Sequence, residues 1–137
     1  MPNAGAAGRG DAQIRAIAAL FAVAGVSHFV APDLFIRIVP PWLPDWLGTP
    51  RTLVHVSGMA ELAGAAGVLI PATRRAAGWG LLALLVAVYP ANVQMLIDAR
   101  ATGASSWYVV ALWIRLPLQP LLGWWVWRRT IRRPSNG

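Results

Sequence analysis

The stretch VHVSGMAELAGAAGVLIP (Val54 to Pro71) decides the fold, because it is long and apolar enough to cross a lipid bilayer. Its middle carries one carboxylate, Glu61, and its only other ionisable side chain is His55 near one end. A charge at the centre of a membrane helix costs about 3 kcal/mol on insertion scales, so such a residue normally has a partner. Arg115 occupies the middle of another apolar stretch. We therefore expect a membrane bundle built around a buried Glu61–Arg115 centre.

The composition of the whole chain favours a membrane protein over a water-soluble domain. Of the 137 residues, 57% are hydrophobic and 12% are charged, whereas soluble domains carry about 25% charged residues. The formal net charge is +7, and the chain has arginine but no lysine. Most arginines lie at the ends of apolar segments, which fits orientation in a membrane, so we expect no nucleic-acid partner. The absence of cysteine excludes disulfides, thiol relays and cysteine-ligated metals.

Four apolar segments each have roughly the 17–25 residues that a spanning helix needs. The expected fold class is therefore all-α, an antiparallel four-helix transmembrane bundle that occupies residues 14–127. Its expected helices are 14–31, 53–71, 76–97 and 107–127.

The remaining segments are expected to lie outside the hydrocarbon core. Residues 1–13 are small and polar, which predicts a disordered cytoplasmic N-terminus, and residues 128–137 form a basic cytoplasmic tail. Residues 32–52 are rich in proline and tryptophan, which forbids one regular helix and suits the headgroup level. We expect this segment to be an interfacial cover between the first and second helices.

A cleaved signal peptide is the alternative interpretation of the first apolar segment. Arg9 and Arg15 precede it, and Ala22-Val23-Ala24 resembles a cleavage site. However, the apolar run before that site is short and apolar character continues beyond it, so we expect an uncleaved helix.

The placement of arginine predicts the orientation of the bundle. With four spans both termini share one side, which would hold eight arginines: Arg9, Arg15, Arg74, Arg75, Arg128, Arg129, Arg132 and Arg133. The other side would hold three: Arg37, Arg51 and Arg100. The positive-inside rule then puts both termini in the cytoplasm of a multi-pass protein of the cell membrane.

Polar residues are expected to gather in the outer half of the bundle. Glu61 and Arg115 are each eight residues from the outer end of their expected helix, or about 12 Å deep, so their depths match. The expected buried polar core or ligand-binding site consists of Glu61, Arg115, His28, Asn92, Gln119, Ser57 and Tyr89. No metal constellation is present, because two histidines, one buried acid and no cysteine are too few ligands. No catalytic residue can be assigned.

Four stretches together resemble the DoxX-like family of small four-helix membrane proteins. They are AGVSHFVAPDLFIRIVPPWLP (24–44), SGMAELAGAAGVLIPATRRAAGWG (57–80), LLVAVYPANVQM (84–95) and WIRLPLQPLLGWWVW (113–127). The resemblance covers about half of the chain and implies that His28, Glu61, Asn92, Arg115 and Gln119 form a shared polar core. It also implies association with membrane redox systems, or with the folding and transport of other membrane proteins.

Two functions are consistent with these residues. In the first, the outer-half polar pocket binds a small amphipathic molecule, such as a quinone, in support of a membrane redox partner. In the second, the chain is a non-catalytic accessory or chaperone-like membrane subunit, and the Glu61–Arg115 centre is structural. A self-sufficient enzyme is not expected, and the lipid bilayer is the one partner that composition predicts.

Overall fold

The computed structural model describes the backbone of residues 4–132, and every regular element in this range is helical. The long helices are α1 (Ala4–Val30), α3 (Pro50–Leu69), α4 (Arg74–Ala101) and α5 (Ser106–Val126). Three short elements complete the order: α2 (Pro32–Ile36), the 3-10 turn η1 (Asp45–Leu47) and the π-helical turn η2 (Trp127–Ile131). Within the described range, four helices are long and apolar enough to cross a membrane, which indicates a multi-pass membrane protein.

Two helices extend beyond one of their expected ends by four residues or more. Helix α1 begins at Ala4, inside the segment expected to be disordered, because lengthening an existing helix adds one hydrogen bond for each residue fixed. Residues 1–3 lie outside the described residues. Helix α4 continues to Ala101, past the expected end at residue 97, and stops before Gly103, whose φ is +67°. The amide of Ala104 then donates to the Ala99 carbonyl at 2.9 Å and closes the helix end.

The connector between α1 and α3 contains two short helical elements, α2 and η1. It ends at Thr49, whose hydroxyl accepts from the Thr52 amide at 3.2 Å and caps α3, with Pro50 at the first helical position. An exposed ion pair between Asp33 and Arg51, 3.4 Å apart, links α2 to α3.

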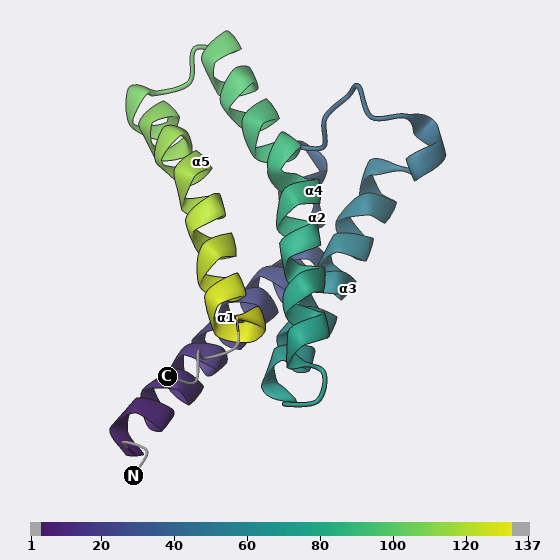
Figure 1. The fold of residues 1–137 in the computed structure, drawn as a ribbon. Helices are drawn as coiled ribbons and strands as arrows, with labels where there is room; N and C mark the ends of the chain where they lie inside the picture. Colours follow the sequence, from purple (N-terminus) through teal and green to yellow (C-terminus); the bar gives the residue numbers. More distant parts are fainter. Residues whose placement is uncertain (1–3, 133–137) are drawn as a thin grey trace.

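The long helices pack in a fixed order. Helix α3 contacts both α1 and α4, and α4 contacts both α3 and α5. Helix α5 lies on the side of α4 that faces away from α3 (Figure 1). One core draws on all four helices, at the end of the bundle where α3 ends and α4 begins: Ile17, Ala18, Phe21, Ala65, Val68, Leu81 and Val126. A second, smaller core joins only α4 and α5 at their other ends: Leu96, Ala99 and Leu112.

The start of the expected basic tail is packed against the bundle. Turn η2 contacts α4, and both Thr130 and Ile131 are buried. The contact needs Gly78 on α4, because a side chain there would collide with Thr130. Residues 133–137 of the expected tail lie outside the described residues.

Candidate functional site: two separate polar pairs

Two glycines bring α1 and α3 into close contact. A Cβ at Gly25 would lie 2.8 Å from Leu62 Cγ and 2.9 Å from the Gly58 carbonyl oxygen. A Cβ at Gly58 would lie 2.7 Å from His28 Cβ and 3.0 Å from the Gly25 carbonyl oxygen. Small residues allow such an approach of two membrane helices. His28 and Glu61 each follow one of these glycines by three residues, so they project from the same crossing point.

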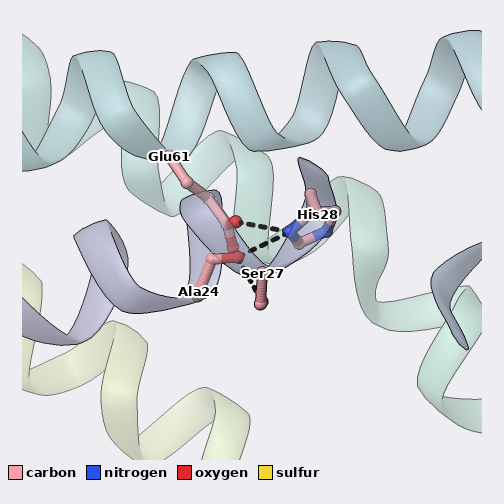
Figure 2. A network of polar contacts seen from close by, with 4 residues as sticks. All are labelled: Ala24, Ser27, His28 and Glu61. Atoms are coloured by element: carbon pink, nitrogen blue, oxygen red, sulfur yellow. Dashed lines mark hydrogen bonds and ion pairs between the residues drawn. The ribbon is translucent and has the colours of Figure 1, made fainter. Parts of the chain in front are cut away.

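His28 and Glu61 face each other beside this crossing. The imidazole Nδ1 of His28 lies 3.1 Å from Oε2 of Glu61, and the two side chains are 11% and 14% exposed (Figure 2). The same Nδ1 lies 2.8 Å from the carbonyl oxygen of Ala24, which also accepts from the Ser27 hydroxyl at 2.6 Å. Oε2 of Glu61 is buried and has no hydrogen-bond donor aligned with it among the described residues. The pair is therefore an ionisable centre in which one carboxylate oxygen is poorly satisfied.

An aromatic ring of α2 packs against this pair. The ring of Phe35 on α2 stacks on the ring of His28, with centroids 3.9 Å apart and planes 22° apart. Phe29 stacks on His55 at 5.3 Å, so the second histidine is engaged with a different ring. Thus part of the connector covers the pair.

A second polar pair joins α4 to α5. The amide nitrogen of Asn92 donates to the Gln119 side-chain oxygen, and both residues are buried. The Gln119 amide nitrogen in turn donates to the carbonyl of Leu85 at 2.6 Å. This chain of hydrogen bonds engages the Asn92 amide nitrogen and both polar atoms of the Gln119 side chain, and it fixes the register of α5 on α4.

The expected Glu61–Arg115 pair is not formed, so that prediction is wrong. Within the described side chains, Glu61 makes its ion-pair contact with His28, and Arg115 makes none. The Arg115 side chain is exposed on α5, and α5 packs against α4 instead of α3. Equal depth in two helices does not make them neighbours. The single polar cluster expected from the sequence is instead divided between two helix interfaces.

The remaining candidates, Ser57 and Tyr89, belong to neither pair. Ser57 is half-buried on α3. Tyr89 and Gln119 line an open groove of about 910 Å³ between α4 and α5, which we call the α4–α5 groove. Its other lining residues are Trp79, Leu82, Ala83, Leu85, Val86, Pro90, Pro120 and Gly123. Tyr89 and Gln119 were predicted as candidates from the sequence, but a groove at this interface was not.

A family model described as a domain of unknown function, DUF8561, matches residues 17–130. The chain belongs to this family. No curated protein and no solved structure matches the chain. The matched region contains both polar pairs and the whole lining of the α4–α5 groove. The family description assigns no activity to them.

Proposed function

We propose that the chain is a DoxX-like protein of the cell membrane, an antiparallel four-helix bundle with both termini in the cytoplasm. The excess of arginine at the ends where α1 begins and α4 begins supports this orientation. Residues 32–52 would then lie at the outer interface. Trp42 and Trp46 in this segment are 62% and 82% exposed, as expected for rings at the headgroup level.

We further propose that the protein binds a small amphipathic molecule, such as a quinone, in support of a membrane redox system. The observation that carries this proposal is the α4–α5 groove, whose volume of about 910 Å³ is of the size that small-molecule sites have. Its lining is mostly apolar, and three side chains in it carry polar atoms: Trp79, Tyr89 and Gln119. The proposed site therefore differs from the outer-half polar pocket expected from the sequence, because neither His28 nor Glu61 lines it.

The groove offers the chemistry that a quinone ring requires. The Tyr89 hydroxyl can donate to a ring carbonyl. Pro90 and Pro120 lack amide hydrogens, so the carbonyls four residues earlier lose their helical donor near the same groove. Gly123 leaves room for an isoprenoid chain beside these groups. An apolar body with a few hydrogen-bonding atoms at one end fits this arrangement.

Filling the groove tests this function. A Cβ at Gly123 would meet Leu82 at 3.5 Å, an ordinary contact, so Gly123→Leu is expected to fold and to project into the groove. Gly80→Leu is the matched control, because a Cβ at Gly80 meets nothing within 4 Å. We expect a short-chain ubiquinone to bind to the wild type and to Gly80→Leu in lipid nanodiscs, and to lose most of its binding in Gly123→Leu. Equal binding by all three proteins would refute a site in the groove.

A non-catalytic accessory or chaperone-like subunit is the second candidate function. The hydrogen bonds between Asn92, Gln119 and Leu85 favour it, because they engage both polar atoms of the Gln119 side chain within the protein. In this function the polar pairs fix helix register, and the groove receives an apolar segment of a membrane-protein partner. Co-purification of a stoichiometric membrane protein from the native membrane, lost on Gly123→Leu but not on Gly80→Leu, would support it.

A further inference from the structure

We propose that His28 and Glu61 form a proton-binding site, in which one exchangeable proton keeps the pair electrically neutral inside the membrane. The inference does not depend on a ligand in the α4–α5 groove, because the pair lies at the α1–α3 interface. Its geometry is drawn in Figure 2.

The contact with Ala24 fixes the tautomer of His28. A backbone carbonyl can only accept a hydrogen bond, so Nδ1 of His28, 2.8 Å from the Ala24 oxygen, must carry a hydrogen. That hydrogen is present in the neutral imidazole and in the imidazolium alike. Glu61 Oε2, 3.1 Å from the same nitrogen, is a second acceptor without an aligned donor. Two places remain for a further proton: Nε2 of His28 and the carboxyl group of Glu61.

The low dielectric constant of the membrane determines how many further protons the His28–Glu61 pair binds. With no further proton, a carboxylate faces a neutral imidazole, and the buried site carries an uncompensated negative charge. With one proton on Nε2, an imidazolium faces a carboxylate, and with one proton on the carboxyl group both side chains are neutral. Both of these forms have zero net charge. Two further protons would leave a net positive charge, so the one-proton state is the most stable in a low-dielectric interior.

No other described side chain near the pair is placed to neutralise the charge of the Glu61 carboxylate. On α2, Asp33 pairs with Arg51 of α3 at 3.4 Å, in contact with solvent. Arg37, which follows α2, is exposed, and His55 of α3 stacks on Phe29. The charge balance of Glu61 therefore depends on His28 and on the exchangeable proton.

The pair is positioned to exchange this proton at the face covered by α2. Both side chains retain a small exposed fraction, 11% for His28 and 14% for Glu61. Phe35 stacks on one face of the imidazole ring. A proton from water at this end of the bundle can bind to Nε2 or to the carboxyl group, and it can leave by the same route. No other bond is made or broken.

Nuclear magnetic resonance of the full chain in lipid nanodiscs tests the proposal, with ¹⁵N-labelled histidine and ¹³C-labelled glutamate. We expect the wild type to show a protonated Nδ1 on His28 at every pH, and the loss of one proton from the pair as pH rises. In Glu61→Gln this step should disappear or move its midpoint by about one pH unit or more, which corresponds to about 1.4 kcal/mol. In His55→Gln, the matched control, it should be unchanged.

Two results would overturn the proposal. One is a wild-type His28 whose neutral form carries its hydrogen on Nε2 instead of Nδ1. The other is a titration step of His28 that is the same in the wild type and in Glu61→Gln. The first result is read from the wild type alone, so the proposal stays open to refutation even where Glu61→Gln fails to fold.

Discussion

Gly58→Ala is expected to loosen the crossing of α1 and α3 that positions the His28–Glu61 pair. The new Cβ would lie 2.7 Å from His28 Cβ, 2.9 Å from Phe29 Cε2 and 3.0 Å from the Gly25 carbonyl oxygen. The first distance is 0.7 Å short of the 3.4 Å at which ordinary contact begins. Since His28 Cβ and the Gly25 carbonyl move only with the backbone, no change of rotamer relieves these two contacts, and α1 must shift.

The size of the effect follows from two opposing contributions. Overpacking of this kind typically costs about 1–3 kcal/mol. Replacing a helical glycine by alanine gains up to about 1 kcal/mol of helix propensity, which would mask part of the loss. Gly80→Ala gains the same propensity and meets nothing within 4 Å. The free energy of unfolding of Gly58→Ala should therefore be about 1–3 kcal/mol below that of Gly80→Ala.

Equilibrium unfolding by sodium dodecyl sulfate in mixed micelles, followed by circular dichroism, measures this difference. Both variants are compared with the wild type in the same lipid–detergent mixture. If Gly58→Ala were as stable as Gly80→Ala, the close approach at Gly25 and Gly58 would be refuted as the contact that holds α1 on α3.

Two further predictions concern the polar residues. Arg115→Leu should leave the free energy of unfolding unchanged or raise it, because the Arg115 side chain is exposed and does not pair with Glu61. In the same unfolding assay, a large loss of stability would instead be evidence for a buried Glu61–Arg115 pair. Gln119→Leu should lower the free energy of unfolding by about 1–2 kcal/mol, because the Asn92 amide nitrogen loses its acceptor and the Leu85 carbonyl loses the Gln119 donor. The double variant Asn92→Leu/Gln119→Leu should lose less stability than the sum of the losses in the two single variants. Strictly additive losses would contradict the hydrogen bond between the two side chains.

The helical fold could be predicted because it depends on local quantities. Length and hydropathy alone mark segments that can span a bilayer, and α3 and α5 occupy nearly their expected ranges. The ends of α1 and α4 could not be predicted as well, because polar residues next to an apolar segment can continue a helix without entering the membrane.

The arrangement of the candidate site could not be predicted from depth along each helix. Glu61 and Arg115 have matching depths, but depth does not say which helices are neighbours. A better signal was present: Gly25 precedes His28, and Gly58 precedes Glu61, by the same three residues. Two glycines at equivalent places allow a close crossing, and this crossing brings the imidazole to the carboxylate.

The sequence by itself determined that this protein has four long apolar helices and that ionisable and amide side chains lie within them. Only the tertiary structure decided how those side chains are paired: His28 with Glu61 between α1 and α3, and Asn92 with Gln119 between α4 and α5. The physical reason is that hydropathy acts on each helix separately, whereas pairing depends on which faces can approach closely. That is set by the fit of small residues against their neighbours, as at Gly58, and by the order in which the helices pack.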